Sequence, residues 1–188
     1  MTTEPSKTIK LPVIDANSEN VSPYGQLLGP ENKVSANVGD FYEGAVNVTS
    51  PVAFKSDNET CLSLASIQPR PFELTFLERH FKHTQTFIPL SGKPFVAVLG
   101  KPNDDEMPDL DKLQAFRFDG HSGFTMHIGT WHEFPFAIEK DTNVVVILRE
   151  ETTQNLSSDN IIDGEAHGGD LDKKNILRRT GKLITLDI

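Results

Sequence analysis

Two short clusters of polar side chains have the residue types and spacing of a small-molecule site. The first runs from Glu78 through His80 to Gln85, and it places an acid, an imidazole and an amide within eight residues. The second extends over residues 126–133 and contains His127, His132 and Glu133. Imidazole and carboxylate groups that converge can bind a divalent metal ion, or they can transfer protons as base and acid. The residue types leave both possibilities open, and they make an enzyme the leading interpretation.

Short apolar runs on both sides of the clusters predict the elements that position them. Each run is four to eight residues long, is rich in Val, Ile, Phe or Thr, and is bounded by Pro or Gly, as expected for β-strands. No long stretch has the period of a helix, so the sequence predicts an all-β sandwich, jelly roll or small barrel. Because alternate side chains of a strand share a face, Glu78 and His80 should point the same way. The expected strands are 41–48, 61–67, 72–77, 86–90, 95–99, 113–118, 123–128, 134–138 and 143–149.

The length of 188 residues fits one domain. We expect a flexible tail over residues 1–10 and a single β-barrel domain over 11–188, with a polar loop excursion around 150–172. The formal net charge of -9 argues against nucleic-acid binding, which needs a basic face. Residues 1–10 lack the pattern of a signal peptide, and no apolar run approaches the ~20 residues that span a membrane. These features predict a cytoplasmic protein with no membrane partner.

The first cluster resembles the first motif of the cupin superfamily. That motif has two histidines at i and i+2, a glutamate four or five residues later and a glycine seven residues beyond. Glu78, His80, Gln85 and Gly92 occupy these positions, with Glu in place of the first His and Gln in place of the Glu. Residues 129–132 are similar to the Gly-to-His part of the second motif. The resemblance implies a cupin-type double-stranded β-helix, a jelly-roll barrel with a few short helices.

A narrower resemblance concerns the ureidoglycolate lyases. The segment 77–80, Leu-Glu-Arg-His, followed by Gln85 and Phe-Ile-Pro at 87–89, resembles the central signature of that family. His127 with the Trp-His pair at 131–132 is similar to its second signature, and 144–149 to the strand that follows. The chain departs from the family pattern at Glu133, where the family has a second consecutive His, and at Leu148, where it has Asp.

The resemblance implies a lyase that cleaves ureidoglycolate to glyoxylate and urea in allantoin and purine degradation. It implies a homodimer, a small-molecule carboxylate as substrate, a divalent metal ion of unspecified identity and no organic cofactor. The implied catalytic residues are His80, His132, Glu78 and His127, and the implied metal ligands are His80, His132 and Glu78. The implied substrate contacts are Gln85, Arg149, Trp131 and Glu133.

Two alternatives stay open. Glu133 adds a carboxylate where the family has an imidazole, which would suit a divergent cupin lyase or isomerase acting on another small hydroxy or oxo acid. A non-catalytic cupin that binds a small ligand is the other alternative, because a fold does not by itself determine a function.

Overall fold

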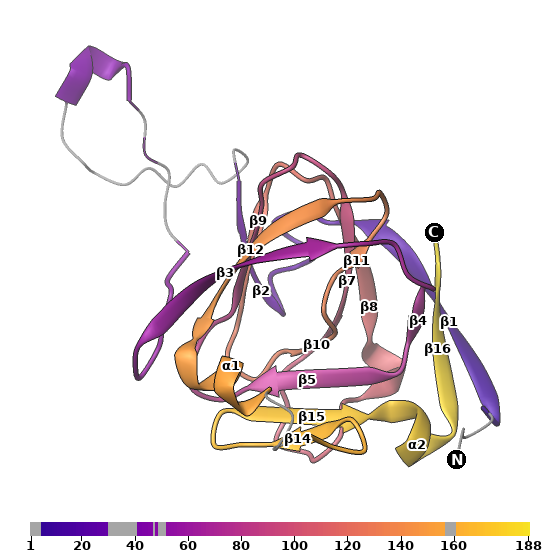
Figure 1. Cartoon of the computed structure of the whole chain (residues 1–188). Coiled ribbons are helices and arrows are strands. Elements are labelled where there is room, and N and C mark those ends of the chain that lie inside the picture. Colours follow the sequence, from indigo (N-terminus) through magenta and orange to yellow (C-terminus); the bar gives the residue numbers. More distant parts are fainter. Residues whose placement is uncertain (1–4, 30–40, 47, 49–51, 157–160) are drawn as a thin grey trace.

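The computed structural model describes residues 5–29, 41–46, 48, 52–156 and 161–188. Most of the regular secondary structure in the described chain is β-strand, arranged in two sheets (Figure 1). The larger sheet contains β1 (Lys7–Asp15), β4 (Glu73–Leu74), β5 (Phe76–His80), β7 (Phe95–Gly100), β8 (Gln114–Phe118), β10 (Trp131–His132), β11 (Phe136–Ala137), β13 (Ile161–Ile162), β14 (Glu165–His167), β15 (Leu171–Asn175) and β16 (Lys182–Asp187). The smaller sheet contains β2 (Gly25–Leu28), β3 (Thr60–Ile67), β6 (Thr86–Pro89), β9 (Gly123–Met126) and β12 (Thr142–Arg149).

The two sheets enclose one apolar core. The larger sheet has the order β13-β14-β15-β5-β10-β7-β8-β1-β16-β4, with β11 beside β7, and the smaller one has the order β2-β9-β6-β12-β3. Phe87 and Phe124 from the smaller sheet meet Phe95, Leu99 and Phe116 from the larger sheet in a continuous cluster. Two curled, largely antiparallel sheets around a shared core form the cupin-type barrel that the sequence predicts.

A second apolar cluster covers the outer side of the larger sheet. Val96 and Val98 of β7 alternate with the inward-facing Phe95 and Leu99, and they pack outward with Trp131. The short helix α2 (Ile176–Thr180) contributes Ile176 to this outer cluster. Strand β5 and its neighbours therefore have one side chain pointing into the barrel and the next pointing into the outer layer.

Strand β5 lies between β10 and β15, with antiparallel pairing on both sides. Glu78 is opposite His132 on β10 and opposite Lys173 on β15. The run of β15 along β5 is visible in Figure 1. This register brings together residues that are more than fifty positions apart in the sequence, and it determines which side chains can meet inside the barrel.

Three expectations from the sequence need correction. Strand β1 begins at Lys7, so the predicted tail over 1–10 overlaps a strand that pairs with β16; residues 1–4 lie outside the described residues. The predicted excursion over 150–172 contains α1 (Glu150–Asn155), β13, β14 and the start of β15. Its polar residues form ordered structure because they pair with β5 and with each other. The expected strand over 41–48 begins instead with the 3-10 helix η1 (Phe41–Gly44).

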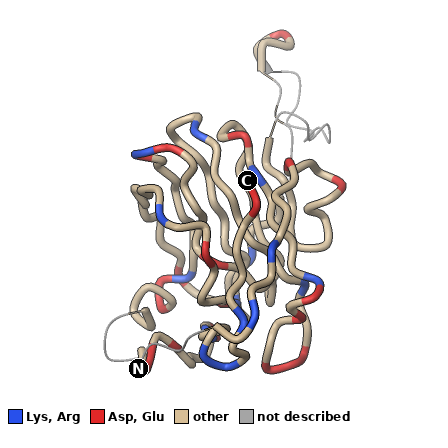
Figure 2. The backbone as a smooth tube through the Cα atoms, turned by 90° about the vertical axis from the view of Figure 1, so that its right-hand side faces the viewer, with Lys and Arg blue, Asp and Glu red and all other residues tan. Residues whose placement is uncertain are grey.

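Acidic and basic residues are interspersed along the backbone (Figure 2), and no one sign dominates the face in view.

A further 3-10 helix, η2 (Leu110–Lys112), lies in the acidic connection between β7 and β8. Among the helices of the described ranges, none is both long enough and apolar enough to cross a membrane.

Candidate active site

Glu78, His80 and His132 converge on the inner side of the larger sheet. Glu78 and His80 are two residues apart on β5 and share a face, and the pairing of β5 with β10 brings His132 beside them. The His132 Nε2 atom lies 3.7 Å from the Glu78 Oε1 atom, and the rings of His80 and His132 are 5.2 Å apart between centroids. One potential ligand atom from each residue lies within 4.8 Å of the others. The expected meeting of the two sequence clusters occurs at these three residues.

The hydrogen bonds of this cluster determine where its lone pairs lie. The His132 Nδ1 atom is 2.9 Å from the Thr130 carbonyl oxygen, which can only accept, so Nδ1 carries the proton and donates it. The Nε2 atom of neutral His132 therefore has a lone pair directed toward the carboxylate of Glu78. Both ring nitrogens of His80, and Nε2 of His132, are buried without a hydrogen-bond partner in the described part of the chain.

Burial also controls the charge of these groups. Burial lowers the pKa of His80 to about 3, and the neighbouring His132 adds to the effect. Burial likewise lowers the pKa of His132. Burial alone would raise the pKa of Glu78, but Lys173, His132 and His80 together hold it below its ordinary value. At neutral pH the site thus contains two neutral imidazoles and a carboxylate, which are the protonation states that bind a metal ion.

This arrangement fits a divalent cation. Two electron-rich atoms, His132 Nε2 and Glu78 Oε1, face each other, and the buried nitrogens of His80 have no donor or acceptor of their own. Unsatisfied buried polar atoms are costly, and a cation between them would remove that cost. The described residues thus include a group that could hold a metal ion, as the sequence suggests.

Lys173, which the sequence did not indicate, adds a positive charge to the cluster. The Lys173 Nζ atom lies 3.1 Å from Glu78 Oε2. Burial alone would lower the pKa of Lys173, but Glu78 and Glu133 raise it above its ordinary value, so the ammonium group stays charged. Glu133 lies near this pair and is 3.8 Å from the Arg70 guanidinium. Its pKa is raised by burial, and Glu78 adds to this while Lys173 and Arg70 oppose it.

A buried histidine and aspartate adjoin the cluster on the other side of His80. The rings of His80 and His83 are 4.6 Å apart between centroids. The His83 Nδ1 atom is 2.9 Å from Asp170 Oδ2, and both side chains are fully buried. His83 stands between the motif positions, and Asp170 is 87 residues farther along the chain. Only the pairing of β15 with β5 could have revealed this contact.

Trp131 does not line the site. Its side chain points to the outer side of the larger sheet, where the indole N–H donates to Asn103 Oδ1 at 2.8 Å. The Arg79 guanidinium lies 4.2 Å from the centroid of the indole ring. The expectation that Trp131 contacts substrate is therefore wrong in this structure, because Trp131 and His132 are consecutive in a strand and face opposite ways.

Arg149 and His127 also lie outside the cluster. Arg149 is buried and paired with two acids: its Nε atom is 2.6 Å from Asp57 Oδ1, and a second nitrogen contacts Glu151. Its charge is therefore already balanced, which corrects its expected contact with substrate. His127 is exposed, and its Nε2 atom lies 3.2 Å from the Ser22 carbonyl oxygen. It lines a separate surface hollow of about 400 Å³ together with Thr84, so its catalytic role has no support from this geometry.

Gln85 is buried, and its side-chain oxygen has no partner in the described residues. Its backbone carbonyl accepts from the amide of Met126, which joins β6 to β9. The orphaned amide oxygen is compatible with a role in binding a ligand, and that role stays a prediction.

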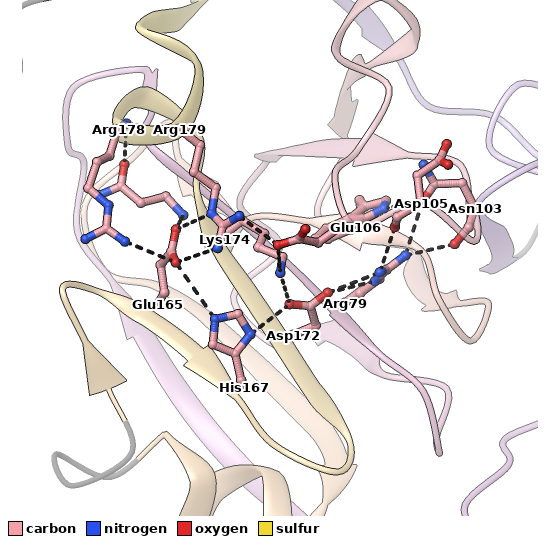
Figure 3. Close-up of polar contacts among 12 residues, drawn as sticks. Arg79, Asn103, Asp105, Glu106, Glu165, His167, Asp172, Lys174, Arg178 and Arg179 are labelled. Atoms are coloured by element: carbon pink, nitrogen blue, oxygen red, sulfur yellow. Dashed lines mark hydrogen bonds and ion pairs between the residues drawn. The ribbon is translucent and has the colours of Figure 1, made fainter.

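On the outer side of β5, an ion-pair network attaches β15 to the barrel (Figure 3). Arg79 pairs with Asp172 at 3.1 Å and donates to the Asn103 and Asp105 carbonyl oxygens. Glu165 on β14 accepts from Arg179 at 2.8 Å. These contacts hold β15 in the register that places Lys173 beside Glu78.

The buried histidines predict a pH-dependent stability of the metal-free protein. An unfolded histidine is protonated below about pH 6.5, whereas His80 resists protonation down to about pH 3. The unfolded state then binds the additional proton, so the free energy of unfolding should fall as the pH drops through this window. One histidine can contribute a slope of up to about 1.4 kcal/mol per pH unit.

Urea unfolding between about pH 7 and pH 4 should show a shallower dependence of the free energy of unfolding on pH for His80→Gln than for the wild type. The exposed control His121→Gln should keep the wild-type slope, and equal slopes for all three proteins would contradict the assignment.

The chain is similar in sequence to proteins of known family. The sequence profile of the family described as "Ureidoglycolate lyase" matches residues 8–164. Ureidoglycolate lyases from Escherichia coli O1:K1 / APEC and from Shigella boydii serotype 18 (strain CDC 3083-94 / BS512) are each 31% identical over 143 residues. The alignment covers 75% of this chain and 88% of each relative. A solved dTDP sugar isomerase from Desulfovibrio desulfuricans G20 is similar at 20% identity, over 66% of this chain and 72% of that one, with a TM-score of 0.34. From the profile match and the identity to these relatives, the chain belongs to the ureidoglycolate lyase family.

Proposed function

We propose that this protein is a ureidoglycolate lyase, which cleaves ureidoglycolate to glyoxylate and urea. The observation that carries the proposal is the convergence of Glu78, His80 and His132 on one face of the barrel in a member of that family. Neutral His132 has a lone pair that can accept a proton, and the Glu78 carboxylate supplies negative charge beside it.

The reaction needs a single proton to move within the substrate. When the hydroxyl group loses its proton, the carbonyl of glyoxylate forms, the bond between carbon and nitrogen breaks, and the urea nitrogen takes up a proton. The Nε2 atom of His132 has the free lone pair required of a base, because Nδ1 is committed to Thr130. The same imidazole can return the proton to the departing urea, so no second acid is needed and the proton balance closes.

As the alternative to proton transfer by His132, we propose that Glu78, His80 and His132 hold a divalent metal ion; Nε2 of His132 is then a metal ligand and not the base. Support comes from the unpartnered nitrogens of the two histidines and from the carboxylate that faces them. When bound, such an ion would act as a Lewis acid that lowers the pKa of the substrate hydroxyl group. Imidazole with carboxylate suits several transition metals, zinc among them.

Lys173 is the group that we propose to bind the substrate carboxylate, in place of Arg149. Its ammonium group is partly exposed, lies at the edge of the cluster and is positively charged. The Arg149 charge is already paired with two acids. A carboxylate within reach of Lys173 would place the substrate hydroxyl group near His132 and Glu78.

We also propose that the protein is a homodimer. Leu62 and Leu64 on edge strand β3 are 71% and 63% exposed, and they are opposite Ile147 and Val145 of β12 in the sheet register. Val145 is in turn opposite Ile88 of β6. This apolar stripe on the outer face of the smaller sheet is typical of a surface that a partner covers. A place in allantoin and purine degradation, which follows from the family's reaction, is part of this proposal, and so is a cytoplasmic location.

The lyase proposal predicts equimolar urea and glyoxylate from racemic ureidoglycolate. Replacing His132 with alanine removes the proposed base, and kcat should fall by about 10²-fold or more. His121→Ala, at an exposed loop position, should retain wild-type kcat. Both products can be measured by separate colorimetric assays. A folded wild-type protein that forms neither product would contradict the proposal.

The assignment of Lys173 predicts a selective effect on substrate binding. Because a hydrogen bond to a charged group is worth about 1.5–3 kcal/mol, Lys173→Met should raise KM by about 10- to 100-fold. Lys173→Arg, which retains the charge, should recover part of this loss. The matched control is Lys174→Met, since Lys174 is the next residue on β15 and pairs with Glu106 on the other face. Steady-state kinetics that give equal KM values for both methionine variants would refute the assignment.

The dimer predicts a mass of twice the 20.9 kDa of the chain in light scattering after gel filtration. The double substitution of Leu62 and Leu64 by Asp would place charge in the most exposed part of the apolar stripe, and it should shift the protein to the monomer mass. Ile162→Asp, at an equally exposed residue on β13, is the control and should remain dimeric. A wild-type protein of monomer mass at micromolar concentration would argue against this interface.

A further inference from the structure

Charged side chains lead from the surface of the protein to the inner cluster. The side chains of Arg70, Lys173, Glu133 and Glu78 are 36%, 21%, 14% and 7% exposed, respectively. Burial lowers the pKa of Lys173, Glu78 and Glu133 raise it above its ordinary value, and Arg70 opposes them. Arg70 and Glu133 therefore lie at the accessible end of the cluster, beside the ammonium group that we propose to bind the substrate carboxylate.

The guanidinium group of Arg70 is held in place from several sides. Its Nη1 atom donates to the Pro135 carbonyl oxygen at 2.9 Å, and its Nη2 atom donates to the Phe134 carbonyl oxygen at 2.7 Å. Its Cζ atom lies 3.9 Å from the centroid of the Phe136 ring. The Nη2 atom is 3.8 Å from Glu133 Oε1, so a fixed positive charge lies beside that carboxylate.

The carboxylate of Glu133 retains most of its capacity to accept hydrogen bonds. Its Oε1 atom accepts from the backbone amide of Phe134 at 3.0 Å, and within the described ranges no group donates a hydrogen bond to Oε2. A carboxylate has about four lone-pair sites. Burial raises the pKa of Glu133, as expected of a carboxylate with few donors around it. A ligand with N–H groups would supply the missing donors.

The ureido group of ureidoglycolate is such a ligand. It has an N–H and an NH₂ on either side of one carbonyl, and two of these N–H bonds are parallel and point away from the carbonyl oxygen. Parallel N–H donors match the two oxygens of a carboxylate, as in bidentate pairs of arginine with carboxylates. The ureido and carboxylate groups of the substrate share one carbon atom. The neighbouring Glu133 and Lys173 can therefore bind the two groups of one molecule.

We propose that Glu133 is the specificity-determining residue that binds the ureido group, and that Arg70 is its positioning residue. The inference rests on the proposed lyase function, and it assigns one end of the substrate to each of two charged groups. A negatively charged group in place of the ureido group would be repelled by Glu133. At this position the pattern of the ureidoglycolate lyases has a histidine, so the contact belongs to this chain's own residues.

The test compares two ligands that share a carboxylate and differ in the ureido group. Oxalurate has the carboxylate and a complete ureido group, whereas oxamate has the carboxylate and a simple amide. Neither has the hydroxyl group that the reaction needs, so their dissociation constants can be measured by calorimetry without turnover. The wild type should bind oxalurate about 10- to 100-fold more tightly than oxamate, because hydrogen bonds to a charged group are strong. Glu133→Gln should lose most of this preference and keep the wild-type affinity for oxamate.

The other variants separate the two ends of the ligand. Lys173→Met should weaken both ligands equally, because both have the carboxylate. Arg70→Gln should lose part of the preference for oxalurate, and Arg70→Lys, which retains the charge, should recover some of it. Glu139→Gln, at an exposed acid six residues farther along the chain, is the matched control and should keep the wild-type preference.

A wild-type protein without preference for oxalurate would overturn the inference. So would a Glu133→Gln variant that keeps the wild-type preference, or one that loses both ligands to the same extent. Urea and glyoxylate formation is measured on the same preparations. A protein that prefers oxalurate through Glu133 but forms neither product would support the ureido contact and contradict only the lyase proposal.

Discussion

The alternation of side chains along β5 is the constraint on which the site depends. Glu78 and His80 face the barrel interior, and Leu77 and Arg79 face the outer layer. Because β10 and β15 pair with β5 on opposite sides, Glu78 is beside both His132 and Lys173. A shift of one residue in either register would turn the opposing side chain away from the cluster. Acid, imidazole and ammonium groups meet through strand register, without any dedicated loop.

Contacts on the outer side of the larger sheet stabilise this register, although they lie outside the candidate site. Arg79 is buried against Asp172 and lies over the Trp131 indole ring, and that ring donates to Asn103. Breaking a buried pair by removing one partner typically costs about 3–5 kcal/mol, because the other charge is left uncompensated. Strands β5 and β15 thus place polar side chains in the site inside the barrel, and polar side chains on their outer face stabilise the pairing of the two strands. Substitutions on the outer face can therefore shift β15 and change the geometry of the site.

Period-two patterning and motif spacing together predicted the inner trio and the all-β barrel from the sequence. The same rule excludes Trp131 from the pocket once His132 is placed inside it, so that error was avoidable. Lys173 and Asp170 could not be found this way, because their contacts with Glu78 and Lys82 span 95 and 88 residues and depend on the pairing of β15 with β5. The acids that neutralise Arg149 lie before β3 and in α1, and no local pattern indicates either contact.

We propose that the substrate binds between the inner faces of β5, β10 and β15. A crystal structure of the protein soaked with glyoxylate, together with elemental analysis of the crystals, tests it most directly. We predict glyoxylate density beside Glu78, His80 and His132, with its carboxylate directed to Lys173. Glyoxylate bound only at Arg149, or in the hollow beside His127, would contradict the account.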